Sequence, residues 1–315
     1  MRTAVRRLVT AAKQAGQLSS GQLAVAVSGG ADSLALAAAA QHQARRLNVT
    51  VHGLIVDHGL QPGSDKVAAE AAEQLTELGI PHVRVLTTKV QGPGGMEAAA
   101  RRARYEALRS ALPAADAIVL LGHTRDDQAE TVLLGLGRGS GPRSIAGMRP
   151  LDPPWGRPLL TVTRAQTERA CTAQGLTYWS DPHNVDPAFT RVRLRNEVLP
   201  LLEDVLQGGV ADALARTAAQ LREDNDALDA LAAEMLVDEP EGLDTEKLAN
   251  APAAIRRRVL RSWLMRRGVT ELTDAQLRDV DALIGEWRGQ GGVLLRGGLV
   301  AQRAHGRLQL DRASP

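Results

Sequence analysis

The chain has 315 residues, of which 44% are hydrophobic and 23% charged, and its formal net charge is +2. This length and apolar content give room for about two folded domains, so a chain that is disordered throughout is excluded. Its single cysteine, Cys171, excludes an internal disulfide, a CxxC redox pair and a cysteine-based zinc or iron–sulfur site within one chain.

The first 122 residues alternate short apolar runs with alanine-rich helical segments. We expect strands at 23–27, 51–56, 82–86 and 117–121, with helices from residue 33, at 64–78 and at 95–112. Strands that alternate with helices of about 12 residues indicate βαβ units and a parallel sheet. The expected fold class is therefore α/β, a Rossmann-like parallel sheet with helices on both faces. Right-handed crossovers place the loop after every strand at one edge, where such sheets bind ligands.

The rest of the chain changes character after the fourth expected strand. Glycine and proline are so dense over 135–158 that we expect a long loop without regular elements. A strand at 159–162 follows, and Thr163 is the expected N-cap of a helix that buries Cys171 as a small hydrophobe. Further helices are expected at 191–206, from 210 to about 237, and at 245–248, 253–267 and 273–287.

Three short strands close the chain, at 293–296, 299–303 and 307–310. The pair Gly297-Gly298 between the first two predicts a two-residue hairpin. We expect three parts: a catalytic domain at 1–207, a helical linker at 208–242 and a small, mostly helical C-terminal domain at 243–315.

The segment 28–33, which reads SGGADS, carries the clearest chemistry. Glycines between a strand and a helix let backbone N–H groups approach a phosphate, and the helix N-terminus adds its dipole. Asp32 can hold a magnesium ion that bridges phosphate oxygens. The chain has no Walker A lysine and no GxGxxG in this turn, so neither a P-loop NTPase nor a dinucleotide site fits. The alternative is a capped helix start, which the complete SGGADS disfavours.

These six residues resemble the PP-loop (N-type ATP pyrophosphatase) superfamily, whose members cleave ATP to AMP and pyrophosphate while adenylating a carbonyl oxygen. Further motifs follow in order: VDHGL at 56–60 with Ser64-Asp65, EAxxRxxRY at 97–105, GHxxDDQxET at 122–131, RGSGP at 138–142, RPLL at 157–160 and RNxxLPL at 195–201. The series resembles the tRNA(Ile)-lysidine synthase family over about residues 20–205. The later segment resembles that family's first C-terminal domain more loosely, and we expect its further C-terminal domain to be absent. Asp181-Pro182-His183-Asn184 departs from the family's Asp-x-Ser-Asn.

The resemblance implies ATP-dependent ligation of L-lysine to C2 of the wobble cytidine in isoleucine tRNA with a CAU anticodon. The reaction passes through an adenylated cytidine and gives lysidine, AMP and pyrophosphate, which changes codon reading from AUG to AUA. The implied cofactors are ATP and Mg²⁺. The implied ATP-binding residues are Ser28, Gly29, Gly30, Ala31, Asp32, Ser33, Asp57, His58 and His123, with Asp32 also as the metal ligand.

Lysine needs a pocket with both signs of charge, because it carries a carboxylate and two ammonium groups. The resemblance places its ammonium groups near Asp127 and Glu130 and its carboxylate near Arg104, with Arg101 as the alternative. Asp127 and Glu130 share one face if Asp127 opens a helix, and one of them can accept the ε-ammonium proton before attack. The expected catalytic residues are Asp32, Asp127, Glu130 and Arg104. Each motif taken alone also fits a solvated helix face.

Only four of the 38 basic residues are lysines, and arginine's planar guanidinium suits phosphate. We expect tRNA contacts at two arginine groups, Arg191, Arg193 and Arg195 with Asn196, and Arg256 with Arg257. Phosphate contacts of this kind position an RNA without specifying its sequence. With aromatic residues at 2%, a stacking platform for single-stranded bases is not expected. Plain solvated faces are the alternative for both groups.

The chain start lacks the apolar stretch of a signal peptide, and no run of about 18 apolar residues follows. We therefore expect a cytoplasmic protein with no membrane partner, either a monomer or a homodimer. The rival functions are another PP-loop enzyme, such as a tRNA thiolase or an NAD synthetase, and a nucleotide sensor without catalysis. The single cysteine disfavours a thiolase that relays a persulfide.

Overall fold

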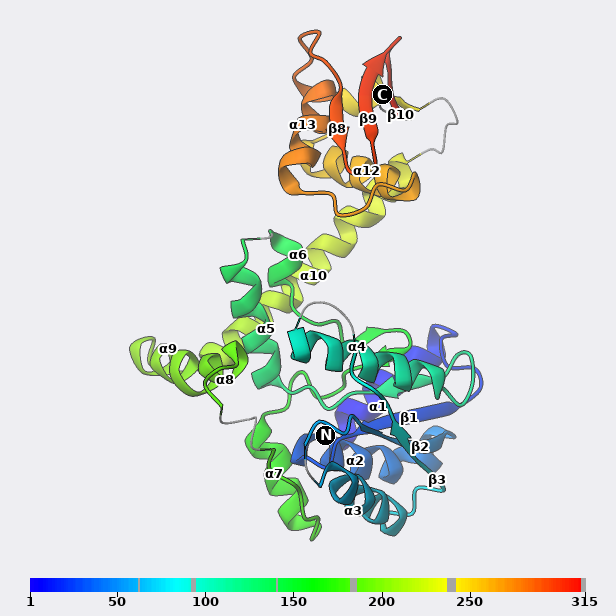
Figure 1. Ribbon diagram of the computed structural model, residues 1–315, viewed down its shortest axis with the longest axis vertical. Coiled ribbons are helices and arrows are strands. Elements are labelled where there is room, and N and C mark those ends of the chain that lie inside the picture. The colour runs from blue at the N-terminus through cyan, green and yellow to red at the C-terminus, as the bar shows by residue number, and fades with distance from the viewer. Residues whose placement is uncertain (62, 92–94, 140, 182–185, 237–241, 313–315) are drawn as a thin grey trace. The chain divides into compact units, whose positions relative to one another are not determined.

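The computed structural model describes residues 1–61, 63–91, 95–139, 141–181, 186–236 and 242–312. The chain divides into two compact units, Met1–Ala219 and Gln220–Pro315, which run from blue to yellow-green and from yellow to red in Figure 1. The predicted division at 207 and 242 stays a prediction. No helix in the described part of the chain has the length and apolar content that crossing a membrane requires.

The first unit contains a six-stranded sheet in the order β3-β2-β1-β4-β6-β5. The strands are β1 Gln22–Val27, β2 Thr50–Asp57, β3 His82–Thr87, β4 Ile118–Leu120, β5 Leu151–Asp152 and β6 Trp155–Gly156. All neighbouring strands pair in parallel except β5, which runs antiparallel to β6. The expected fold class is confirmed, and the order places β1 in the middle, between β2 and β4.

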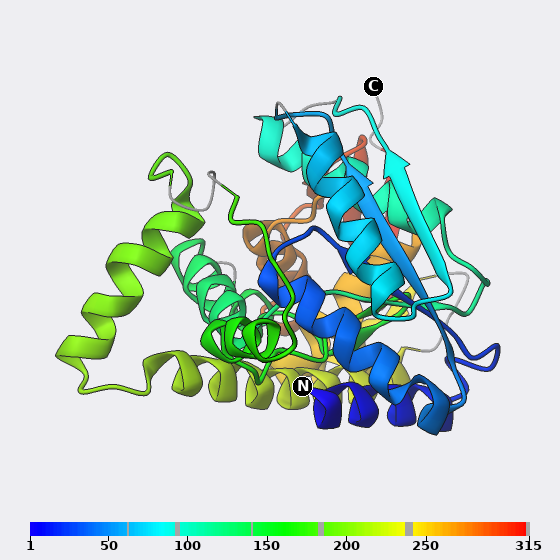
Figure 2. The same cartoon turned by 90° about the horizontal axis from the view of Figure 1, so that it is seen from below.

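Helices cover both faces of this sheet, as β1 shows by its alternation of side chains. Leu23, Val25 and Val27 pack into the core shared with α1 (Arg2–Gln14), α2 (Ala31–Leu47), α3 (Ser64–Glu77) and α7 (Arg164–Ala173). Ala24 and Ala26 face the other side, where α4 (Gly95–Ser110) contributes Leu108. Figure 2 shows α2 and α3 side by side along the same face.

Two predicted elements of this unit need correction. The segment 159–162 is a turn, not a strand, and the last parallel strand is β6 at 155–156. Leu159, Leu160 and Val162 are buried although they form no ladder, so their apolar character reflects core contact alone. The long loop at 135–158 holds the end of α5 (Arg125–Gly137), the short helix α6 (Pro142–Ile145) and both β5 and β6.

The predicted helix at 191–206 is present with an interruption. It consists of α8 (Thr190–Arg193), a π-helical turn (Leu194–Val198) and α9 (Leu199–Val205). Pro200 has no N–H to donate to the carbonyl four residues earlier, so regular α-helical bonding cannot continue through this point. The π turn changes the direction in which Arg195 projects, which matters for the site below.

The second unit combines helices with a four-stranded antiparallel sheet in the order β7-β10-β9-β8. Its elements are the end of α10 (Val210–Met235), β7 Leu243–Asp244, α11 Thr245–Ala249, α12 Ala253–Arg266, α13 Asp274–Gly285, β8 Val293–Leu295, β9 Leu299–Ala304 and β10 Arg307–Arg312. Trp263 of α12 lies at its core, with α13 packed alongside. The hairpin between β8 and β9 is present, but Leu295 pairs with Leu299, so its loop has three residues (296–298) and not the predicted two. Gly297 and Gly298 in this loop have φ of 81° and 68°.

Candidate active site

The SGGADS segment forms a tight turn from β1 into α2. Gly29 has φ of +82°, and a Cβ at Gly29 would lie 3.2 Å from a side-chain methyl of Val67. The Ser33 hydroxyl accepts the backbone N–H of Ser28 at 3.1 Å and donates to the carbonyl of Gly30 at 2.9 Å. This turn and the first residues of α2 line a cavity. Backbone N–H groups and a helix N-terminus at a cavity wall suit phosphate oxygens.

Two cavities meet at this turn. One, of about 250 Å³, lies at the carboxyl ends of β1 and β2, and the other, of about 360 Å³, lies beside the N-terminus of α2. Ser28, Arg104 and Trp179 line both cavities. We call the first the β2 cavity and the second the acidic cavity.

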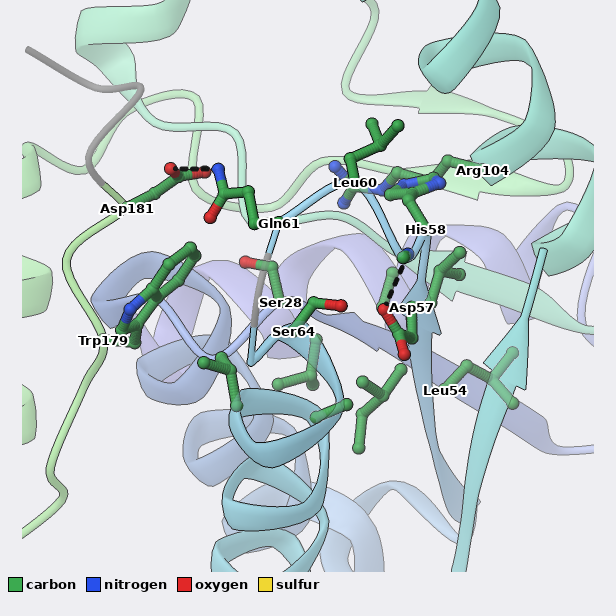
Figure 3. A pocket seen from close by; sticks show the side chains of 17 residues that line it. Ser28, Leu54, Asp57, His58, Leu60, Gln61, Ser64, Arg104, Trp179 and Asp181 are labelled. Carbon is green, nitrogen blue, oxygen red and sulfur yellow. Dashed lines mark hydrogen bonds between the residues drawn. The ribbon is translucent and has the colours of Figure 1, made fainter. Parts of the chain in front are cut away.

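The β2 cavity has apolar walls that include Leu54 and Leu60, together with polar side chains such as Ser28, Asp57 and His58 (Figure 3). Asp57 accepts the backbone N–H of Gly59 at 2.9 Å, which holds the turn after β2. Burial and the neighbouring Arg104 lower the pKa of His58, so its imidazole is neutral at pH 7. On the other side, Gln61 donates to Asp181 at 3.0 Å. A pocket that combines apolar walls with oriented polar groups is typical of a small-molecule or cofactor site.

In the acidic cavity, Asp127 stands at the start of α5, where it forms a capping box with Thr124. Its carboxylate accepts the Thr124 backbone N–H at 2.8 Å and pairs with Arg164 at 3.0 Å and Arg195 at 3.5 Å. Burial opposes ionisation of Asp127, but Arg164, the Thr124 amide and the other nearby positive groups outweigh it and lower its pKa. Asp127 is therefore a fixed negative charge on the cavity wall.

Glu130, one turn further along α5, is fully buried. It pairs with Arg195 at 2.7 Å and lies 3.6 Å from Arg191, while burial raises its pKa. Unlike Asp127, it does not line the acidic cavity and lies behind Arg195. The structure thus brings the two expected lysine-binding acids together but presents only Asp127 directly. Neighbouring acids whose pKa values are pushed apart suit different roles, one as an anion and one as a proton acceptor.

Asp32 faces the same cavity from the first turn of α2. Thr167 donates a short hydrogen bond to its carboxylate, and the Nε of Arg164 lies 3.7 Å away. Burial raises the pKa of Asp32, so a cation beside it would favour its ionised form. Mg²⁺ usually takes one or two protein carboxylates and completes its shell with phosphate oxygens and water. Asp32 fits that pattern, and the described residues contain no cage of three or more metal-binding side chains.

Gly122 and His123 follow β4 and line the acidic cavity beyond the end of that strand. A Cβ at Gly122 would lie 3.1 Å from backbone atoms of Asp32 and Ser33, so only glycine allows β4 to end this close to α2. Burial lowers the pKa of His123 to about 3, against the opposing charge of Asp127. The imidazole is therefore neutral at pH 7 and can accept or donate a single hydrogen bond.

The two candidate arginines of α4 differ in position. Arg104 is half-buried and lines both cavities, whereas Arg101 is exposed, lies 5.0 Å from the centre of the Tyr105 ring and lines neither. Burial lowers the pKa of Arg104. The geometry therefore favours Arg104 over Arg101 as the residue that meets a substrate carboxylate.

The expected tRNA-binding arginines do not all lie on the surface. Arg193 and Asn196 are exposed, and Arg193 pairs with Glu197 at 2.9 Å. Arg195, by contrast, points toward the acids of α5. In the second unit, Arg256 is 9% exposed and both it and Arg257 pair with Asp281, so the expectation of a surface Arg256 is wrong. Asp281 lies 25 residues away in the sequence, so local spacing could not reveal this pair.

Comparison with known proteins shows which family the chain resembles in sequence. Residues 2–202 match a PP-loop domain, and residues 243–309 match a TilS substrate binding domain. A tRNA(Ile)-lysidine synthase of Nocardia farcinica is 61% identical, with 92% of each chain covered. Proteins of that name from Rhodococcus erythropolis and Mycobacterium tuberculosis are 59% and 58% identical, covering 92% and 91% of this chain and 89% and 90% of their own lengths.

The chain belongs to the tRNA(Ile)-lysidine synthase family. This confirms the resemblance seen in the motifs. Among solved structures, a U34-tRNA thiolase, NcsA, from Methanococcus maripaludis is similar with a TM-score of 0.51 and 17% identity over 64% of this chain and 72% of its own. Identity at that level shows a shared PP-loop fold and nothing of the activity.

Three residues of this family member's site had no assigned role in the sequence analysis. Arg164 and Thr167 of α7 contact Asp32, and the backbone N–H of Trp179 donates to the carbonyl of Gly29 at 3.0 Å. Arg164 could have been singled out from the sequence because it directly follows Thr163, the expected N-cap of a helix. Thr167 and Trp179 carried no local signal. His183 and Asn184, where the chain departs from the family pattern, lie outside the described residues.

Proposed function

We propose that this chain ligates L-lysine to C2 of the wobble cytidine of isoleucine tRNA with a CAU anticodon, using ATP and Mg²⁺. The products are lysidine, AMP and pyrophosphate, and codon reading changes from AUG to AUA. The observation that carries the proposal is the meeting of the SGGADS turn with Asp127 in one cavity, in a chain at least 58% identical to three enzymes named for this product. All three substrates occur in the cytoplasm, where we expect the chain to act.

In the first step the cytosine 2-oxygen attacks the α-phosphorus of ATP and pyrophosphate leaves. The β2 cavity would take the adenosine, and the backbone of the SGGADS turn would hold the phosphates. Mg²⁺ on Asp32 would stabilise the negative charge that develops on the departing pyrophosphate. Neutral His58 and His123 would offer hydrogen bonds without adding charge.

In the second step the lysine ε-amine attacks C2 and AMP leaves. Asp127 would hold an ammonium group of lysine, and Arg104 would meet its carboxylate. The ε-ammonium must lose a proton before it becomes a nucleophile. Glu130 is suited to accept that proton once Arg195 moves aside, because burial raises its pKa.

The chain also has surfaces suited to tRNA. Arg193 and Asn196 are exposed beside the π turn next to the active site, and residues 243–309 match the family's substrate binding domain. We propose phosphate contacts for Arg193 and Arg191, and a hydrogen bond to the RNA for Asn196. In the second unit, Arg257 is the remaining candidate, because its side chain is one-third exposed although it pairs with Asp281.

The test is incubation with ATP, Mg²⁺, lysine and isoleucine tRNA bearing a CAU anticodon, followed by nucleoside mass analysis. We expect lysidine and an equal amount of pyrophosphate, with turnover beyond a single adenylation dependent on both lysine and tRNA. A transcript with uridine in place of the wobble cytidine is the matched control and should give neither product. Nucleotide binding with no pyrophosphate release would indicate a sensor, and pyrophosphate release that requires a sulfur donor or a nicotinate substrate would indicate another PP-loop enzyme.

A further inference from the structure

Arg164, the first residue of α7, contacts two carboxylates that belong to different substrate sites. Its Nη2 donates to Asp127 at 3.0 Å, and its Nε lies 3.7 Å from Asp32. Under the proposed function, Asp32 serves ATP and its metal, while Asp127 serves lysine. One guanidinium therefore neutralises an acid from each site.

The backbone of Arg164 is held by contacts that do not involve its guanidinium. Its backbone N–H donates to the Asp126 carboxylate at 2.9 Å, and Thr163 caps the same helix end through a capping box with Gln166. The side chain is about one-quarter exposed and lines the acidic cavity. The guanidinium can thus change partners without moving the helix that carries it.

The contact between Arg164 and Asp32 is also incomplete. The Nε of Arg164 is buried and has no hydrogen-bond partner among the described residues, since 3.7 Å is too long for one. The SGGADS turn lines the same cavity, where phosphate oxygens would be strong acceptors for a guanidinium. A buried donor without a partner, beside a phosphate-binding turn, points to a bond that forms only with a ligand.

We propose that Arg164 couples the two substrate sites, so that ATP with Mg²⁺ and lysine each strengthen the binding of the other. The inference rests on the proposed function. Phosphate oxygens would draw the guanidinium away from Asp127 and leave that carboxylate for the lysine ammonium. Lysine alone would instead bring a second cation against Arg164, with no phosphate to receive the displaced guanidinium. The favourable charge balance is reached only when both ligands are present.

Calorimetric titration of lysine tests the coupling directly, because binding rather than turnover is measured. The nucleotide is α,β-methylene-ATP with Mg²⁺, in which the bond that would be cleaved is replaced. We expect saturating nucleotide to lower the lysine Kd by about tenfold, within the usual range for coupled sites. Lysine should lower the nucleotide Kd by the same factor, since coupling of binding is reciprocal. A lysine Kd that is unchanged or raised by the nucleotide would overturn the proposal.

Arg164→Met removes the shared cation while keeping a long side chain. In this variant we expect the two ligands to bind with less than about twofold coupling, whatever their individual affinities. Arg164→Lys keeps the charge and should retain part of the coupling. Arg216→Met is the matched control, because Arg216 is an exposed arginine paired with Asp212 that lines neither cavity. Circular dichroism and Tm report whether each variant folds.

The outcomes separate this inference from the proposed function. If the wild-type chain makes lysidine and Arg164→Met retains the full coupling, the inference is wrong and the function stands. If the wild-type chain makes no lysidine although ATP and lysine bind with coupling lost in Arg164→Met, the proposed reaction is wrong and the link between the cavities stands. Full coupling in Arg216→Met together with its loss in Arg164→Met supports the proposal.

Discussion

Gly122→Ala tests whether the end of β4 positions the SGGADS turn. The added Cβ would lie 3.1 Å from the Asp32 carbonyl carbon and the Ser33 nitrogen, and 3.2 Å from the Ser33 Cα. These are backbone atoms of the first turn of α2, and non-bonded carbon atoms prefer about 3.5–4.0 Å. The N-terminus of α2 must therefore shift by several tenths of an ångström.

Overpacking of this kind costs about 1–3 kcal/mol, which corresponds to a fall in Tm of about 2–4 °C for each kcal/mol. Since a misplacement of about 1 Å can cost about 100-fold in rate, we expect the smaller shift to raise the KM for ATP about tenfold. Thermal unfolding and pyrophosphate release measure the two effects. Gly122→Ala with wild-type Tm and wild-type KM would refute the reasoning.

Gly137→Ala is the matched control for this experiment. Gly137 is the exposed last residue of α5, and a Cβ there would meet no atom within 4 Å. Alanine is favoured over glycine in a helix by up to about 1 kcal/mol, so this variant should be as stable as the wild type or slightly more so. Its KM for ATP should not change.

Four further predictions concern single charged or titratable groups. Asp32→Ala should abolish AMP formation in a pyrophosphate assay while tRNA affinity in a filter-binding assay stays within about twofold, and normal turnover would exclude the metal role. Asp281→Ala leaves Arg256 buried without its partner, so we expect a loss of about 3–5 kcal/mol in urea unfolding. His123 has a folded pKa lowered to about 3, below its unfolded value, so its neutral burial stabilises the fold above about pH 6.5 and that stability is lost on acidification toward pH 3. His123→Asn should accordingly flatten the decline of stability below pH 6.5, by up to about 1.4 kcal/mol per pH unit. Arg193→Ala should weaken tRNA binding and reduce the salt slope by about 1, and an unchanged slope would argue against a phosphate contact.

The sheet could be predicted because its signals are local. A strand of six to eight residues followed by a helix repeats three times before residue 112, and each unit can be recognised without knowledge of the others. At 159–162 the same reasoning predicted a strand, and the structure has a turn there. Its leucines and valine are buried by contacts with distant elements, and a short apolar run does not distinguish a strand from a buried turn. Likewise, the π turn at 194–198 packs against α5, a contact between segments far apart in the sequence that local spacing does not reveal.

The site was predictable to the extent that its residues follow strands. Ser28 directly follows β1, Asp57 is the last residue of β2 and His123 lies shortly after β4, so a parallel sheet brings them to one edge. Arg164 and Trp179 follow no parallel strand. They reach the cavities because α7 packs against α2 and the chain after α7 crosses the SGGADS turn, and both are consequences of tertiary packing.

The sequence by itself determined the turn at Gly29, the capping of α5 by Thr124 and the placement of Asp127 and Glu130 on one helix. Each depends on backbone freedom and hydrogen bonds within a few neighbouring residues. Only the tertiary structure decided which charges meet: Arg164 with Asp32 and Asp127, Arg195 with Glu130, and Arg256 with Asp281. A guanidinium on a long, flexible side chain pairs with whichever carboxylate the packing of helices brings within about 4 Å, and sequence spacing does not encode that choice.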